Sequence, residues 1–284
     1  MKTIYLNKGN LAAYQESASS NVMALGCFDG LHLGHVKVIQ SALREAKERN
    51  VRLSVMSFFP HPKTVIGEKA CFHYLMPQSE KEKRLSELGV DIFYLVEFDK
   101  DFAGLSPQAF VQEYLIKLGV IHAIAGYDFS YGSRGAGNMK TLKQDSGDRL
   151  EVTTVGKVEY KGEKISSTRI RQQLLHGHVE ELPNLIGKSY EIKCVCAGTV
   201  LTPYSNYTLP APGRYEVTVY NNRNSLRTEV DVNEKSIMMT REKQIPSWLE
   251  GNITIIWNRL VKAERINRGS FIINIQRSNQ VLEA

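Results

Sequence analysis

Residues 21–36 read NVMALGCFDGLHLGHV and carry the strongest structural signal in the chain. The first five of these residues are mostly apolar and predict a buried strand, whereas residues 34–50 place apolar side chains at helical spacing. A turn with glycines at positions 26, 30 and 34 separates the two segments. Residues 52–58 again have the pattern of a strand, so this part of the chain predicts a β-α-β unit.

The same alternation of strands and helices continues through the first two-thirds of the chain. The pattern predicts a charged helix at 80–88, a strand at 92–96, a helix at 106–118 and a strand at 123–125. Ser106 followed by Pro107 is a typical helix start. The predicted fold class is therefore α/β, a Rossmann-like parallel sheet covered on both faces, with ligands expected at the carboxyl ends of its strands.

The pattern changes after about Gly187. Residues 215–220 and 252–257 have the character of strands, and Asn, Gly and Pro clusters separate such runs with little helical periodicity. This predicts a small antiparallel β-barrel domain. We expect two domains, residues 1–187 and residues 188–284.

Composition excludes several classes of protein. The chain has 284 residues, 42% of them hydrophobic and 23% charged, which is typical of a globular protein. Its net charge of +6 lacks the clustered basic stripe of a nucleic-acid-binding protein. No apolar run approaches the roughly 18–20 residues that span a bilayer, and the first ten residues lack a signal-peptide core. We expect a cytoplasmic protein that binds neither nucleic acid nor membranes; the sequence does not indicate its oligomeric state.

The four cysteines are expected to be reduced, buried thiols. The only close pair is a Cys-x-Cys without a second pair or a nearby histidine, which argues against a zinc site. The residues are Cys27, Cys71, Cys194 and Cys196.

The turn between the first strand and the long helix predicts a nucleotide site. Its glycines let the backbone approach a ligand closely, and the following helix presents unpaired N–H groups to an anion. His32 and His35 can donate hydrogen bonds to phosphate oxygens and stabilise the charge that develops on a leaving pyrophosphate. The alternative is a helix-capping loop with two surface histidines, but the strand-turn-helix context favours nucleotide binding.

Three further motifs follow in order. FPHP at 59–62 comes after a strand, where an aromatic ring and an imidazole could line a flat-ring pocket, although by itself it is more typical of a structural turn. GYDFSYGSRGAGN at 126–138 follows another strand, and from the residues alone Asp128 has equal claims as a cap and as a ligand. ISSTRIR at 165–171 offers hydroxyl groups, helix N-terminal N–H groups and a guanidinium to a polyphosphate, or simply caps a surface helix.

Together these motifs resemble the nucleotidylyltransferase superfamily, and in particular the bacterial bifunctional riboflavin kinase/FAD synthetases. The similarity runs over nearly all of residues 20–187, and GHVE at 177–180 and LIGKSY at 185–190 resemble that family's passage into its second domain. The resemblance implies direct adenylyl transfer, in which the phosphate of FMN attacks the α-phosphorus of ATP, pyrophosphate leaves and FAD forms. Mg²⁺ would come with ATP, held by the substrate phosphates, and the small-molecule substrates would be ATP and FMN; the sequence does not indicate flavin-transfer partners.

The resemblance also implies the residues of the site. Those expected to take part in catalysis are His32, His35, Asp128, Ser167, Thr168 and Arg171. The ATP-binding set is expected to be Gly26, Cys27, Phe28, Asp29, Gly34, His35, Ser167, Thr168 and Arg171. The FMN-binding set is expected to be Phe59, Pro60, His61, Asp128, Phe129 and Gly132. Arg169 is expected to be solvated, because Arg171 occupies the basic position of the superfamily's signature.

The second domain departs from the family. The bifunctional enzymes carry a Gly-x-Pro-Thr-Ala-Asn signature whose Thr and Asn hold Mg-ATP for phosphorylation of riboflavin, whereas residues 198–215 contain no such run. Glu250 is a poor match to the family's acidic kinase base. Without these groups nothing organises the metal for phosphoryl transfer, so we expect that the riboflavin kinase activity has been lost.

Three other functions stay open at this point. The enzyme could be fully bifunctional, it could transfer a nucleotidyl group to another acceptor, or the chain could be a non-catalytic flavin or nucleotide sensor. The intact motifs of the first domain weigh against the sensor.

Overall fold

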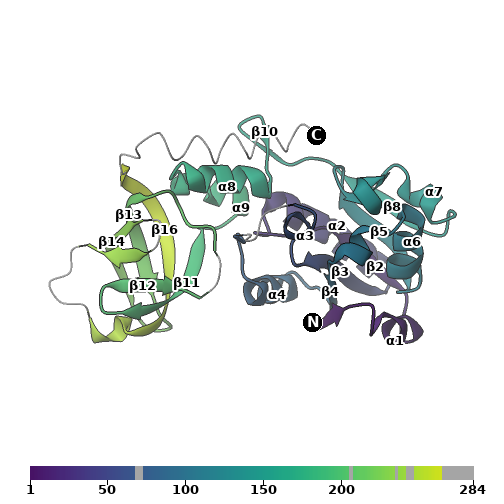
Figure 1. Ribbon diagram of the computed structural model, residues 1–284, viewed down its shortest axis with the longest axis horizontal. Helices are drawn as coiled ribbons and strands as arrows, with labels where there is room; N and C mark the ends of the chain where they lie inside the picture. The colour runs from purple at the N-terminus through teal and green to yellow at the C-terminus, as the bar shows by residue number, and fades with distance from the viewer. Residues whose placement is uncertain (68–72, 205–206, 234–235, 241–245, 264–284) are drawn as a thin grey trace. The chain divides into compact units, whose positions relative to one another are not determined.

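The computed structural model describes residues 1–67, 73–204, 207–233, 236–240 and 246–263 (Figure 1). The chain divides into two compact units. The first comprises Met1–Ile170 with Asn184–Gly187, and the second comprises Arg171–Pro183 with the residues from Lys188 onward. The sequence-based boundary between residues 187 and 188 stays a prediction.

The first unit contains a six-stranded parallel sheet, which confirms the predicted α/β class. Its strand order is β1-β4-β3-β2-β5-β8, and all five pairings are parallel. The strands are β1 (Lys2–Leu6), β2 (Asn21–Leu25), β3 (Arg52–Phe59), β4 (Ile92–Glu97), β5 (Val120–Gly126) and β8 (Glu151–Val155). After β2 the chain places β3 and β4 on one side and then β5 and β8 on the other, so the strand order reverses at β2. Ligands bind at such reversal points in open α/β sheets.

Core packing occurs on both faces of the sheet because neighbouring residues of a strand point to opposite faces. Val22 and Ala24 of β2 belong to one apolar cluster, together with residues of α2 (Leu33–Glu48). Met23 and Leu25 belong to a second cluster, which includes residues of the segment made by α6 (Pro107–Phe110) and a following π-helical turn (Val111–Ile116). The remaining helices of this unit are α1 (Leu11–Glu16), α3 (Pro62–Val65), α4 (Gln78–Glu87), α5 (Lys100–Ala103) and α7 (Leu142–Asp145).

Two short hairpins follow β5 in the first unit, one before β8 and one after it. In one, β6 (Ser130–Tyr131) pairs with β7 (Gly137–Asn138). In the other, β9 (Glu159–Tyr160) pairs with β10 (Glu163–Lys164), directly before α8 (Ser167–Leu175). Both hairpins lie within or beside motifs that the sequence indicated.

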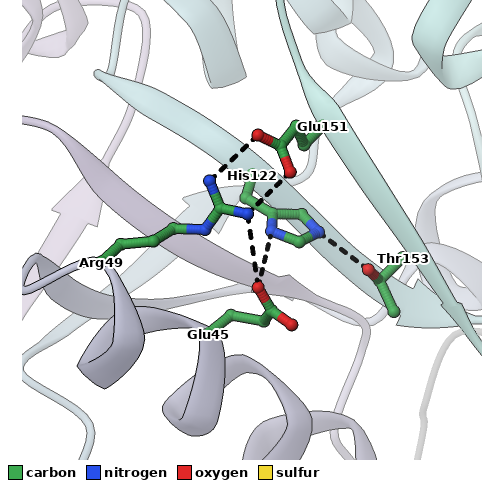
Figure 2. Close-up of polar contacts among 5 residues, drawn as sticks. All are labelled: Glu45, Arg49, His122, Glu151 and Thr153. Atoms are coloured by element: carbon green, nitrogen blue, oxygen red, sulfur yellow. Dashed lines mark hydrogen bonds and ion pairs between the residues drawn. The ribbon is translucent and has the colours of Figure 1, made fainter.

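A polar cluster joins the C-terminal end of α2 to the amino ends of β5 and β8; Figure 2 shows its five residues, Glu45, Arg49, His122, Glu151 and Thr153. The Arg49 guanidinium donates to both carboxylate oxygens of Glu151, at 3.0 and 2.6 Å. The buried His122 ring lies 2.8 Å from Thr153 Oγ1 through Nε2 and 3.4 Å from Glu45 Oε2 through Nδ1. We call these residues the amino-edge cluster.

The second unit contains a closed antiparallel barrel, as predicted. Its strand order is β11-β12-β15-β14-β13-β16, closed by the pairing of β16 with β11. Inward and outward residues alternate, so Tyr215, Val217 and Val219 of β13 are buried, as is Trp257 on the adjacent β16. The strands are β11 (Glu191–Ala197), β12 (Val200–Pro203), β13 (Gly213–Tyr220), β14 (Ser225–Val232), β15 (Ile237–Met239) and β16 (Gly251–Ala263). The second unit also contains the 3₁₀ turns Val179–Glu181 and Ser247–Leu249, while α9 (Pro183–Ile186) falls mainly in the first.

The cysteines follow their prediction in part. Cys194 and Cys196 are unbridged and buried on β11, and burial raises the pKa of the Cys194 thiol to about 12. Cys27 is only partly buried, contrary to expectation, because it lies in the turn after β2. Cys71 lies outside the described residues. Among the helices of the described segments, none is both long and apolar enough to cross a bilayer.

Candidate active site

Three adjacent strands of the sheet deliver sequence-predicted site residues at their carboxyl ends. The turn containing Gly26 and Cys27 follows β2, Phe59 ends β3, and Asp128 follows β5. Since β3, β2 and β5 are neighbours, the three motifs meet at one edge of the sheet, at the reversal point where ligands bind.

The turn after β2 directs its large side chains into the protein and leaves its backbone for a ligand. Phe28 adopts a positive φ of 49° and its ring is buried. That ring packs edge-on against His35, with ring centroids 5.3 Å apart. Gly30 has a φ of 79°, and a Cβ there would meet Leu75 at 3.0 Å. Phe28 therefore shapes the turn from within the core and leaves only its backbone for the nucleotide contact that the sequence predicts.

The two histidines form a stacked pair at the start of α2. His32 caps the helix: its Nδ1 accepts a hydrogen bond from the His35 backbone N–H at 3.2 Å. The two rings stack with centroids 3.6 Å apart and planes inclined by 16°. A Cβ at Gly34 would lie 3.0 Å from the His32 ring, so glycine at this position leaves room for the ring.

Both imidazoles are neutral at neutral pH. Burial, assisted by the charge of Lys164, lowers the pKa of His32 to about 4. Burial also lowers the pKa of His35 well below its ordinary value, and His32 and Lys81 add to this effect. Because Nδ1 of His32 accepts a hydrogen bond, we assign its proton to Nε2, which can donate to a phosphate oxygen. Nδ1 of His35 is buried and has no hydrogen-bond partner within the described part of the chain.

Asp29 ties the turn to two distant segments. Its buried carboxylate accepts from the Leu75 backbone N–H at 3.1 and 3.3 Å. Its backbone carbonyl accepts from the Ser167 hydroxyl at 2.9 Å. The ISSTRIR motif is thus brought against the first turn, as the combination of motifs predicts.

Helix α8 begins at this contact. Thr168 is exposed beside Ser167, and Arg171 lies about one helical turn further along the helix. The expectation for Arg169 is wrong, because its side chain is only 12% exposed. Its guanidinium donates to the Tyr160 and Glu163 carbonyls at 2.8 and 2.9 Å, which fastens the β9–β10 hairpin to the helix.

Asp128 is more than half exposed and forms an ion pair with Lys164. The Lys164 ammonium also lies over the Tyr127 ring, 4.9 Å from its centroid. Both charged groups act on the pKa of His32, so they lie close to the histidine pair. The sequence analysis did not predict a role for Lys164, although its position immediately before the ISSTRIR motif could have indicated one.

The FPHP motif forms an aromatic surface at the end of β3. Phe59 is 47% exposed, and its ring stacks against Tyr74 with ring centroids 6.0 Å apart. The Pro60 peptide bond is cis. His61 caps α3 by accepting from the Lys63 N–H at 3.2 Å, and its own N–H donates to the Tyr74 hydroxyl at 3.1 Å. An exposed, stacked ring of this kind suits a flat aromatic ligand.

Phe129 and Gly132 shape the β6–β7 hairpin. Phe129 packs against the core and stacks on Tyr131, with ring centroids 6.0 Å apart. Gly132 has a φ of 73°, and a Cβ there would lie 2.8 Å from the backbone nitrogen of Pro107. Both residues therefore have structural reasons for their identity apart from any contact with FMN.

Two side chains that the sequence patterns did not indicate support the turn from the protein side. The Ser57 hydroxyl and the Lys81 ammonium both donate to the carbonyl of Cys27, at 2.7 and 3.2 Å. Ser57 alternates with apolar residues on β3, and Lys81 lies in a strongly charged helix, so neither stands out in the sequence. In the described ranges, no group of three or more His, Cys, Asp or Glu side chains could hold a metal ion.

Comparison with known proteins identifies the family of this chain. The family model described as FAD synthetase matches residues 14–169. A bifunctional riboflavin kinase/FMN adenylyltransferase of Bacillus subtilis is 36% identical over 290 residues, covering 93% of this chain and 91% of that protein. An FAD synthetase of Listeria monocytogenes is 32% identical over 224 residues, covering 75% of this chain and 89% of its own. The crystal structure of a macrolide-efflux protein from Streptococcus pneumoniae shares the fold, with a TM-score of 0.81 and 24% identity over 99% of this chain and 98% of that one. The chain belongs to the FAD synthetase family of enzymes.

Proposed function

We propose that this protein transfers the adenylyl group of ATP to FMN and releases FAD and pyrophosphate. The observation that carries the proposal is the neutral, stacked His32–His35 pair at the N-terminus of α2. It lies at the strand reversal point, where Ser167 joins the turn through the Asp29 carbonyl.

In the proposed reaction an oxygen of the FMN phosphate attacks the α-phosphorus of ATP. The bond from that phosphorus to the oxygen bridging to the β-phosphate breaks, and that oxygen leaves with pyrophosphate. The Nε2–H of His32 and the N–H groups at the start of α2 would donate to the phosphate oxygens as their charge shifts toward the leaving group. Ser167, Thr168 and Arg171 would hold the triphosphate from α8. A phosphate monoester is already an adequate nucleophile, so positioning and electrostatics supply the catalysis.

FMN would lie on the side of Phe59 and Asp128. The exposed Phe59 ring suits the flat isoalloxazine, and the Lys164 ammonium beside Asp128 suits its phosphate. Pro60, His61, Phe129 and Gly132 would shape this side of the site. Mg²⁺ would accompany ATP and would neutralise part of the charge of its phosphates.

The test is incubation of the purified protein with FMN, ATP and Mg²⁺, followed by chromatography of the flavins and a pyrophosphate assay. FAD and pyrophosphate should form in equal amounts, and FAD formation should stop when EDTA removes the metal. The proposal fails if no FAD forms and His35→Ala binds ATP as well as the parent protein does.

We further propose that the barrel no longer phosphorylates riboflavin. The support is the absence of a Pro-Thr-Ala-Asn run from the sequence, together with the position of Glu250. The Glu250 carboxylate accepts from the Gly198 backbone N–H at 3.0 Å and so closes a turn of the barrel.

The alternative is a fully bifunctional enzyme, which the name of the Bacillus subtilis relative favours. Riboflavin, ATP and Mg²⁺ supplied without FMN should give no FMN if the kinase activity is lost. Formation of FMN at a rate comparable to that of FAD synthesis from supplied FMN would refute the loss.

A further inference from the structure

Lys81 is a buried cation in a helix whose other charged residues are exposed or partly exposed. The residue is only 4% exposed, although it lies in the polar sequence QSEKEKRLSE of α4. Its ammonium donates to the Cys27 carbonyl at 3.2 Å and lies 3.5 Å from Ser57 Oγ. Within the described residues no carboxylate pairs with it at ion-pair distance. Burial lowers the pKa of Lys81, and the charge of Asp29 acts in the opposite direction.

A buried and unpaired ammonium is costly for stability. Removing a charge from water costs several kcal/mol even after the protein relaxes, and a single neutral carbonyl offsets only part of that. The Cys27 carbonyl does not require this donor, since the Ser57 hydroxyl already donates to it at 2.7 Å. Hydrogen-bond satisfaction of the turn therefore does not explain why a lysine is buried there.

The position of the ammonium relative to the turn suggests a reason. Lys81 contacts the residue that follows Gly26, on the side of the turn that faces the protein. It is also close enough to His35 to help lower the pKa of that imidazole. A polyanion bound on the outer side of the turn would feel this charge through a medium of low dielectric constant, where it is screened less than a surface charge would be.

We propose that Lys81 is a positioning residue for the nucleotide: its ammonium fixes the Cys27 carbonyl and places a positive charge behind the turn on which the ATP phosphates bind. Lys81 acts through the turn and does not touch the reacting atoms. The inference rests on the proposed function in one respect, that the anion on the turn is the triphosphate of ATP.

The experiment compares Lys81→Met, Lys81→Gln and Lys83→Met. Methionine removes both the charge and the donor at similar volume, whereas glutamine removes the charge and keeps a donor. Lys83 lies two residues away on α4, is 70% exposed and is 3.9 Å from Glu87, so its substitution controls for the loss of one positive charge. Measurements are the kcat of FAD formation, the KM values for ATP and for FMN, ATP affinity by calorimetry, and the melting temperature.

Lys81→Met should keep or raise the melting temperature while kcat/KM for ATP falls about ten- to a hundredfold, the scale expected of a displaced positioning group. The kcat/KM for ATP of Lys81→Gln should lie between the values of Lys81→Met and the parent. The KM for FMN should stay unchanged in both Lys81 variants, and Lys83→Met should match the parent in every measurement. The pKa of His35, followed by NMR titration, should rise in Lys81→Met, because a repelling charge has been removed.

A purely structural lysine would give the opposite result: a lower melting temperature with parent-like turnover in the folded fraction. That result overturns the inference, as does parent-like ATP affinity in both Lys81 variants. If Lys81→Met does not fold, the ATP affinity and turnover of Lys81→Gln test the inference, because glutamine keeps a donor to the Cys27 carbonyl and removes only the charge. If the parent protein binds ATP but forms no FAD, the proposed function fails while the binding and NMR measurements still test Lys81.

Discussion

The two ends of helix α2 lie beside histidines in different surroundings. At the N-terminal end lie His32 and His35, and at the C-terminal end Glu45, which also pairs with Arg49, contacts His122 (Figure 2). Burial is the main cause of a lowered pKa in all three histidines. Nε2 of His122 lies 2.8 Å from Thr153 Oγ1 and its Nδ1 lies 3.4 Å from Glu45 Oε2, but in the described part of the chain neither this Nδ1 nor that of His35 makes a hydrogen bond.

The two ends differ in the charged groups around the rings, and we assign a structural role to the cluster around His122 and the proposed nucleotide-binding role to the His32–His35 pair. The amino-edge cluster balances Arg49 with two carboxylates and ties α2 to β5 and β8. At the other end of the helix, the buried Lys81 faces the turn without a paired carboxylate among the described residues. Natural proteins accept such unfavourable arrangements mainly where they serve a ligand. One helix thus carries a stabilising end and a working end.

The largest expected effect is on catalysis at the working end. His32→Ala removes the Nε2–H donor and should lower kcat for FAD formation by about a hundred- to a thousandfold, as for one oxyanion donor. The lost helix cap should cost only about 1 kcal/mol of stability. Flavin chromatography and urea unfolding measure the two effects. A variant that unfolds readily but keeps full turnover when folded would make the N-terminal end structural as well.

The reciprocal substitution at the stabilising end should leave catalysis unchanged. His122→Ala opens a cavity and removes the histidine that Thr153 and Glu45 contact. It should therefore cost about 2 kcal/mol of unfolding free energy. Its kcat should stay within about twofold of the parent value, because a well-folded site at the opposite edge of the sheet is unaffected. A large loss of turnover in the folded variant would contradict the division of α2 into two roles.

Stability should decrease as the pH falls, and this dependence sharpens the comparison. Unfolded histidines have a pKa of about 6.5, and the folded value is about 4 for His32 and is also lowered for His35 and His122. Between the two values the unfolded chain binds more protons, so the free energy of unfolding falls as the pH decreases below about 6.5. Each histidine contributes about 1.4 kcal/mol per pH unit in its window.

Urea unfolding at pH 7, 6 and 5 measures this slope. His32→Asn keeps a good helix cap without a titrating group, so its slope should be smaller than that of the parent. A parent protein of equal stability at pH 7 and pH 5 would refute the neutral state of these rings.

The smallest effect is expected from the exposed ion pair of the amino-edge cluster. Glu151→Gln removes one partner of Arg49, whose side chain keeps its contact with Glu45. The pair is solvated, so the melting temperature should change little, and the change should disappear in high salt. A decrease as large as that of His122→Ala would show that the cluster acts as one unit.

Sequence alone predicted the central β-α-β unit, the parallel sheet and the barrel. The reason is that β2 is mostly apolar, α2 has apolar residues at helical spacing, and β13 alternates buried and partly buried residues. It missed β1 and β8, two edge strands whose side chains are only partly buried and lack a continuous apolar run. It also missed α1, a short helix without a buried residue.

The sequence also predicted part of the grouping of the site residues, whose roles in binding and catalysis stay predictions. The turn, the histidines and Ser167 lie together as the motifs indicated, since each follows a strand or opens a helix at one edge of the sheet. Lys81 could not be found from its neighbours, because nothing in a run of charged residues tells which one points inward. The solvated role expected for Arg169 failed for the same reason: its partners are carbonyl groups of a hairpin, which have no sequence signature.

The hydrogen bond from Ser167 to the Asp29 carbonyl joins residues 138 positions apart. Closing so long a loop costs conformational entropy that local contacts do not, so such contacts form late in folding. During synthesis the turn after β2 leaves the ribosome long before α8 exists. The proposed nucleotide site is therefore completed only when nearly all of the first unit has been made, and a growing chain has no finished site before that point.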